Sequence, residues 1–229
     1  MKPTLLMITG WAHSEESLAP LATALSGSFR VKVQSAAKRM AGALLPDAEV
    51  VLGHSLGGLL AMEQRPPSCK KLILLSSTAR FCAAPDYPCG VEERVLKRMI
   101  LQFKRNPKAV LDAFFKQVHA PDPFSCSAPS SSDQDLLLSG LDYLLKTDLR
   151  TQIPRVNLPV LLLHGTADEI IPASASKWLK KQLPAAMLHL FEGGGHALFA
   201  HQTDWITEKI EAFLSLQATP KSTNLHGKH

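Results

Sequence analysis

A serine between glycines is the residue of this sequence best suited to nucleophilic chemistry. Residues 53–57 read Gly-His-Ser-Leu-Gly, where the buried strand pattern of 49–52 gives way to the helix pattern of 56–64. A sharp strand-to-helix turn lifts such a serine hydroxyl clear of the sheet, and small residues around it avoid collisions with neighbouring backbone. The pentapeptide alone occurs by chance in long chains, but this placement predicts that Ser55 is a nucleophile and not merely a turn residue.

A serine hydroxyl needs a base to activate it and an acid to orient that base. After an elbow of this kind, the acid and then the histidine are expected to follow the serine along the chain. Asp168 lies three residues after Gly165, at the end of an apolar strand pattern, and His196 follows three glycines. We therefore predict Ser55, Asp168 and His196 as the catalytic residues, with Glu169 left open as an alternative acid.

The strand that follows the elbow has no candidate acid at its end. It covers residues 71–75 and runs into Ser-Ser-Thr at 76–78. This removes the usual competing position for the acid and favours Asp168. A plainer interpretation of Asp168 is an acidic residue at the N-terminus of the helix that begins near Pro172.

The remaining histidines and the cysteines have simpler interpretations. His54 is interpreted as a packing residue of the elbow, His164 as a strand-end residue and His201 as a helix-entry residue. These histidines and the four cysteines show no paired ligand spacing, so no metal site is predicted. Four cysteines in 229 residues do not form a disulfide scaffold and fit a reduced, cytoplasmic setting.

Acyl transfer also needs hydrogen-bond donors for the oxyanion of the tetrahedral intermediate. We expect one donor to be the backbone N–H of Leu56, at a helix N-terminus, where unpaired donors point outward. The other is expected to be the backbone N–H of Trp11, after the first strand pattern at 4–8, where Gly10 allows a turn. The Trp11 indole could be a core aromatic and could equally wall the substrate pocket.

The elements that must position these residues alternate between strand and helix. Strands are predicted over 4–8, 29–33, 49–52, 71–75, 160–165 and 186–191, and helices over 15–25, 36–44, 56–64, 173–183 and 204–216. Buried strands alternating with helices predict an α/β fold, with a mostly parallel sheet covered on both faces. The three predicted catalytic residues fall at carboxyl ends of strands, where such sheets bind ligands.

Residues 79–150 interrupt this alternation and are predicted to form a helical lid. Helices are expected over 91–103, 107–118 and 134–146, with a Ser/Pro-rich loop over 124–132. The core is then expected over 1–78 and 151–217, and 218–229 is expected to be a disordered tail because it has no apolar period.

The excess of 25 basic over 20 acidic residues is concentrated on the predicted lid. Seven basic residues surround a single acid, Asp112, between 94 and 116: Arg94, Lys97, Arg98, Lys104, Arg105, Lys108 and Lys116. The cluster is either a solvated helix face or a docking surface for an acidic partner. Nucleic acid is not expected, because aromatic residues are not interleaved with the charges. We also expect no signal peptide and no membrane partner, since the apolar runs have only strand length.

Taken together, these features resemble the α/β-hydrolase superfamily over nearly the full chain. Within it the sequence is similar to the pimeloyl-[acyl-carrier protein] methyl ester carboxylesterases of biotin synthesis. The resemblance lies in Gly10-Trp11, in Gly53-His54-Ser55-Leu56-Gly57-Gly58, in residues 140–150 (Gly-Leu-Asp-Tyr-Leu-Leu-Lys-Thr-Asp-Leu-Arg), in 158–168 and in Gly195-His196. The Thr-Asp-Leu-Arg of 147–150 is the most discriminating part.

The resemblance implies an esterase that needs no cofactor and acts on an acyl chain linked to a carrier protein. It implies carrier docking on basic lid residues, namely Arg94, Lys97, Arg98, Lys104 and Arg105. With the acyl chain under the apolar lid face, Trp11, Leu111, Phe114 and Phe115 are the candidate substrate-binding residues.

The chain departs from the family pattern at positions that shape the pocket. Thr9 stands where His is usual, Ala12 where Gly is usual, and the first hairpin of the family's sheet is missing. The substrate therefore stays open between the carrier-linked ester and small esters or thioesters cleaved by a broad-specificity enzyme. A lyase or carbon–carbon hydrolase with the same triad, and a ligand-binding protein on a hydrolase scaffold, also remain as alternatives.

Overall fold

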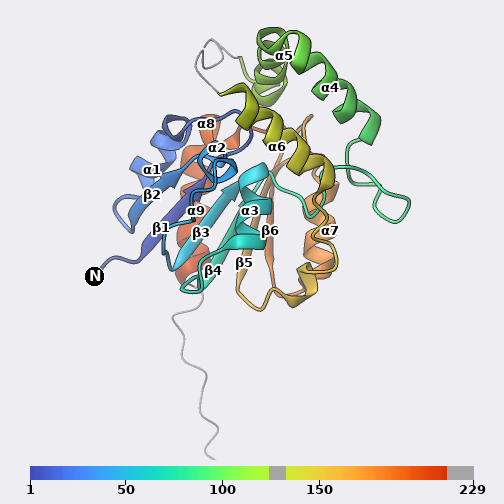
Figure 1. The fold of residues 1–229 in the computed structure, drawn as a ribbon. Coiled ribbons are helices and arrows are strands. Elements are labelled where there is room, and N and C mark those ends of the chain that lie inside the picture. Colours follow the sequence, from blue (N-terminus) through green and yellow to red (C-terminus); the bar gives the residue numbers. More distant parts are fainter. Residues whose placement is uncertain (124–132, 216–229) are drawn as a thin grey trace, which may run out of the picture.

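A computed structural model describes residues 1–123 and 133–215, and its strands form one parallel sheet (Figure 1). The strand order is β2-β1-β3-β4-β5-β6, and every strand pair within the described residues is parallel. The strands are β1 (Thr4–Ile8), β2 (Arg30–Gln34), β3 (Val50–His54), β4 (Lys71–Leu75), β5 (Val160–Gly165) and β6 (Met187–Phe191). The predicted α/β class with a parallel sheet is confirmed.

Helices cover both faces of the sheet, as its continuous apolar strands require. The α-helices are α1 (Ala19–Leu25), α2 (Ala36–Met40), α3 (Leu56–Gln64), α4 (Glu93–Arg105), α5 (Pro107–His119), α6 (Gln134–Lys146), α7 (Ser174–Gln182), α8 (Leu198–His201) and α9 (Thr203–Ser215). Short 3₁₀ helices are η1 (Glu15–Leu18) and η2 (Ile153–Arg155). Leu5 and Met7 of β1 pack with α1 and α9, whereas Leu6 and Ile8 pack with α3 and α6.

Some predicted boundaries are wrong for local reasons. The helix predicted over 36–44 ends at Met40, because Gly42 has φ +92° and turns the chain out of the helix. The helix predicted from Val91 begins at Glu93, since the Val91 carbonyl accepts the N–H of Ala83 and is not available to a helical N–H four residues on.

Two further expectations concern the end of the chain and the long loop. His201 ends the short helix α8 and does not open the last helix, which starts at Thr203. The Ser/Pro-rich loop predicted over 124–132 and the tail predicted from 218 lie outside the described residues.

Helices α4, α5 and α6 form an insertion between β4 and β5. Figure 1 shows α4 and α5 above the sheet, with α6 between them and the sheet. Helix α6 contacts α2 of the main body and α4 of the insertion. The division into a core and a lid at 79 and 150 stays a prediction.

An ion network joins the two chain segments that connect the insertion to the sheet. Arg80, just after β4, donates from Nη1 to Asp148 Oδ2 at 2.7 Å. Arg150 donates to the same oxygen from Nη2 at 2.8 Å and pairs with Asp86 at 2.7 Å. The Arg150 guanidinium also lies over the Tyr87 ring, 5.6 Å from its centroid. The Thr-Asp-Leu-Arg segment thus holds the base of the insertion closed.

We expect Asp148→Asn to lower the free energy of unfolding by about 1–2 kcal/mol at pH 7, since charged hydrogen bonds are lost. Hydrogen bonds from Arg150 and Arg80 hold the pKa of Asp148 well below its usual range. A carboxylate with a depressed folded-state pKa stabilises the protein above pH about 4 and loses that contribution as the pH falls further.

Urea unfolding at pH 7, 5 and 3 measures this effect. The difference between wild type and variant should shrink toward pH 3. Asp112→Asn is the matched control, because Asp112 pairs only with the exposed Lys108 on its own helix, and such pairs contribute little. Equal losses in both variants, or a difference that grows in acid, would contradict the network's role.

Candidate active site

Ser55 lies at the turn between β3 and α3, in a strained backbone conformation. Its φ is 54° and its ψ is −120°, backbone angles that residues other than glycine rarely adopt. A Cβ on Gly53 would lie 2.3 Å from the Gly57 carbonyl oxygen, and one on Gly57 would lie 2.3 Å from the Ile8 carbonyl oxygen. The glycines of the motif are therefore required by close backbone contacts, and Ser55 is the hydroxyl-bearing residue of the turn.

Asp168 and His196, distant in sequence, lie in direct contact. His196 donates from Nδ1 to Asp168 Oδ2 at 2.7 Å, and both side chains are buried. Burial raises the pKa of Asp168, but the nearby His196 and hydrogen bonds from His164 and His196 lower it further, so the net pKa is below its usual range. The carboxylate is thus ionised. Glu169, the alternative acid, instead lines a cavity next to the site.

The other ring nitrogen of His196 has the character of a base. A carboxylate accepts hydrogen bonds only, so Nδ1 carries the hydrogen and Nε2 carries the lone pair. This Nε2 is buried and has no hydrogen-bond partner among the described residues. The elbow contacts the same loop, because His54, next to Ser55, donates from Nε2 to the His196 carbonyl at 3.2 Å.

Two backbone N–H groups are placed around the elbow as candidate oxyanion donors. Leu56 begins α3, and the first N–H groups of a helix have no intrahelical acceptor. The loop after β1 packs on the elbow, since a Cβ on Gly10 would lie 3.1 Å from Ser55 Cβ. Trp11 follows in this loop, and the next residue, Ala12, has φ 61°, a conformation typical of glycine. Ala12 thus holds a backbone conformation that glycine would adopt with less strain.

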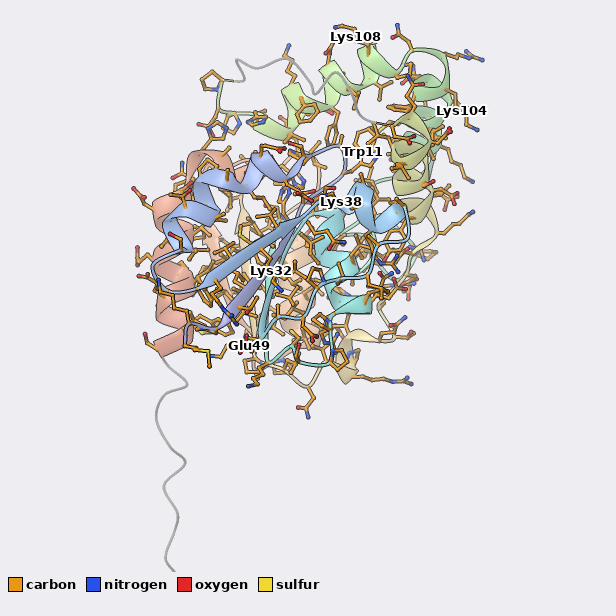
Figure 2. The ribbon with its side chains drawn as sticks, turned by 60° about the vertical axis from the view of Figure 1, so that its left-hand side comes forward. Trp11, Lys32, Lys38, Glu49, Lys104 and Lys108 are labelled. Carbon is orange, nitrogen blue, oxygen red and sulfur yellow. The ribbon has the colours of Figure 1, made fainter. Side chains whose placement is uncertain are left out.

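The Trp11 indole is a core aromatic that joins this loop to the insertion. Its Nε1 donates to the Leu137 carbonyl of α6 at 2.8 Å, and the ring is almost fully buried. It packs edge-on against Phe114, with ring centroids 4.7 Å apart, and against Phe103 at 5.9 Å. Figure 2 shows Trp11 between the insertion and the sheet. The indole does not line the cavity described next.

A cavity of about 630 Å³ lies between α4, α5 and the loop after β5. Its lining is mainly apolar and includes Val95, Leu96, Met99, Val110, Phe114 and Ile170. Of the predicted substrate-binding residues, Phe114 lines this cavity, whereas Leu111 and Phe115 are buried in the apolar core. The cavity borders the acid loop through Ile170, two residues after Asp168.

The five predicted docking residues all lie on α4, but their surroundings differ. Arg94 is paired with Glu92, and Lys97 with Glu93 at 2.6 Å. Arg98 and Arg105 line the cavity, and Lys104 is exposed. Figure 2 shows Lys104 and Lys108 on the outer side of the insertion, away from the sheet.

Three other histidines contact the site, and sequence reasoning missed their contacts. Burial lowers the pKa of His13 to about 4 and that of His54 well below its usual value, so both are neutral. Their rings lie in edge contact, 5.5 Å apart, and the His54 ring is 4.9 Å from that of His196. His164, treated as a strand-end residue, donates to Asp168. A polar residue at the end of the apolar run of β5 was the available signal.

Residues 1–123 and 133–215 contain no group of three or more histidine, cysteine or acidic side chains placed to hold a metal ion. No helix in these ranges combines the length and apolarity needed to cross a membrane. Within them Cys69, Cys82 and Cys89 are free thiols.

Comparison with known proteins shows which family the chain is similar to. The sequence profile of the alpha/beta hydrolase family matches residues 10–208. Proteins named pimeloyl-[acyl-carrier protein] methyl ester esterase are similar in sequence. The one from Aromatoleum aromaticum is 28% identical, covering 89% of this chain and 95% of the relative. The one from Nitrosomonas europaea is 29% identical, with 86% and 90% covered.

Solved structures share the fold at lower identity. An esterase from Exiguobacterium antarcticum superposes with a TM-score of 0.78 at 18% identity, over 93% of this chain and 92% of that one. A hydrolase from Oleispira antarctica reaches 0.79 at 16%, over 94% and 92%. The parallel sheet, the elbow and the profile match lead to one conclusion: the chain is a hydrolase that belongs to the alpha/beta hydrolase family.

Proposed function

We propose that the protein is a cytoplasmic serine carboxylesterase that hydrolyses the methyl ester of pimeloyl-acyl-carrier protein in biotin synthesis. The observation that carries the chemistry is the hydrogen bond between Asp168 and His196. His196 Nε2 has no hydrogen-bond partner among the described residues, and His196 belongs to the loop that contacts the Ser55 elbow. The substrate is supported by the relatives named for this reaction, which match along most of their length.

The proposed reaction proceeds by acyl transfer to the serine. Ser55 Oγ attacks the ester carbonyl while His196 Nε2 takes its proton, and Asp168 stabilises the imidazolium that forms. The N–H groups of Leu56 and Trp11 stabilise the tetrahedral oxyanion, each contributing about 3 kcal/mol to the transition state. Methanol leaves with the proton from His196. Water, activated by the same imidazole, then releases the acid from Ser55.

The helical insertion supplies the proposed substrate site. We place the acyl chain in the apolar cavity, against Phe114, with Leu111 and Phe115 supporting its wall from the core. The insertion, residues 79–150, then acts as a lid over the ester. The acidic carrier docks on the exposed basic side chains of α4, since opposite charges steer such encounters.

A broad-specificity short-chain carboxylesterase is the second candidate. It is favoured by the pairing of Arg94 and Lys97 with acids of their own segment. Paired charges attract a carrier less strongly than free ones, and a small ester needs no docking surface.

The first test is methanol release from methyl pimeloyl-acyl-carrier protein. Wild type should release methanol, and Ser55→Ala should lose the activity by roughly 10⁴-fold or more, because the nucleophile is absent. Labelling by a fluorophosphonate should disappear in the same variant. If wild type cleaves p-nitrophenyl butyrate but releases no methanol, the esterase chemistry stands and the carrier-linked substrate is wrong.

Docking is tested by reversing charges that do not line the cavity. The double variant Arg94→Glu with Lys104→Glu should raise KM for the carrier-linked ester about 10-fold at low salt, through lost attraction. Added salt should narrow this difference. Lys181→Glu, an exposed site on α7, is the control. An equal loss on p-nitrophenyl butyrate would mean that the changes damage the enzyme and not docking.

The pH profile of kcat/KM should show that the uptake of one proton abolishes activity at low pH. His196 must keep its Nε2 lone pair, so kcat/KM falls as the pH decreases, with a slope of one. The low pKa of His13, about 4, keeps it neutral above pH 5. His13→Asn should therefore leave unchanged the pH range over which kcat/KM falls. A slope of two, or a limb that moves in this variant, would contradict the expectation.

A further inference from the structure

His164 is a buried histidine outside the proposed triad, and each of its ring nitrogens has a partner. It ends the apolar run of β5 and is fully buried. Its Nδ1 lies 2.7 Å from Ser176 Oγ, on α7. Its Nε2 lies 2.8 Å from the Ile171 carbonyl oxygen and 3.1 Å from Asp168 Oδ2.

These partners decide which nitrogen of His164 carries the hydrogen. The Ile171 carbonyl and the Asp168 carboxylate both accept hydrogen bonds only, so Nε2 must be the donor. Ser176, itself buried, can then donate its hydroxyl hydrogen to Nδ1. The hydroxyl, the imidazole and the carboxylate form one continuous chain of hydrogen bonds that ends on the acid.

Within residues 1–123 and 133–215, the Asp168 carboxylate lies against four N–H groups. Oδ1 accepts the backbone N–H groups of Ile170 and Ile171, both at 2.8 Å. Oδ2 accepts His196 Nδ1 at 2.7 Å, and His164 Nε2, whose hydrogen also faces the Ile171 carbonyl at 2.8 Å, lies 3.1 Å from the same oxygen. Without His164, the oxygen that faces the proposed base would have a single partner, and the orientation of the carboxylate would rest on the loop alone.

We propose that His164, fixed by Ser176, is a positioning residue for the reaction, because it holds Asp168 Oδ2 in line with His196 Nδ1. This inference rests on the proposed function of Asp168 and His196. His164 does not contact substrate in this role. It acts through Asp168, so its loss should lower turnover and leave substrate binding unchanged.

Three variants separate the hydrogen bond from simple packing. His164→Gln keeps an N–H donor near the position of Nε2, His164→Leu removes the donor while filling much of the space, and Ser176→Ala removes only the hydroxyl. With p-nitrophenyl butyrate, His164→Leu should lose about 10–100-fold in kcat, the usual effect of losing a residue that orients an active-site ligand. KM should change by no more than about two-fold.

Rescue by the conservative variant is the decisive readout. His164→Gln should keep kcat within about three-fold of wild type, and Ser176→Ala should fall between the two. His189→Leu, on β6 opposite Leu163, is the matched control and should behave as wild type. Thermal unfolding checks that each variant folds. If His164→Leu does not fold, the comparison of His164→Gln with Ser176→Ala still decides, since Ser176→Ala must be the slower of the two.

Asp168→Asn, assayed alongside, distinguishes the two levels of the proposal. If Asp168→Asn keeps wild-type kcat, the proposed triad itself is wrong. If Asp168→Asn loses activity while His164→Leu turns over like wild type, only the positioning role is overturned. Equal kcat losses in folded His164→Gln and His164→Leu would also overturn it, because packing alone would then explain the effect.

Discussion

The backbone turn at Ser55 is the constraint on which the rest of the site depends. Ser55 has φ 54° between a buried strand and a helix, and Gly53 and Gly57, two residues before and after it, lie in close contact with other backbone. The turn brings the serine to the carboxyl end of β3, between the ends of β1 and β4 in the parallel sheet. The loops after β1, β5 and β6, at the same edge of the sheet, carry the other groups of the proposed site.

The helical insertion is bound to both loops that flank the serine. On one side the Trp11 indole donates to the Leu137 carbonyl of α6. On the other the N–H of Ala197, next to His196, donates to the Val118 carbonyl of α5 at 3.0 Å. A change in the position of the insertion would therefore displace the loop that carries Trp11 and the loop that carries the proposed base together. The position of the insertion is therefore linked to the geometry of the proposed catalytic groups.

Burial gives the histidines around the site different roles. His13 and His54 lie in surroundings that penalise charge, which holds them neutral, and His54 serves as a donor to the His196 backbone. His196 differs because the carboxylate of Asp168 lies against its Nδ1 and can stabilise a positive ring. The partners of each histidine, and not its position in the sequence, therefore distinguish the two supporting histidines from the proposed base.

The parallel α/β fold, most elements and the elbow can be predicted from the sequence, because apolar runs, glycine spacing and helix periodicity are local properties. The sequence also places Asp168 and His196 after strands, and the structure brings them together. Three contacts are visible in the folded chain alone: Asp168 and not Glu169 meets His196, Trp11 donates to α6, and His164 with Ser176 reaches the acid. Those contacts join residues whose partners lie on other elements, and hydrogen bonds across elements leave no periodic pattern in the chain.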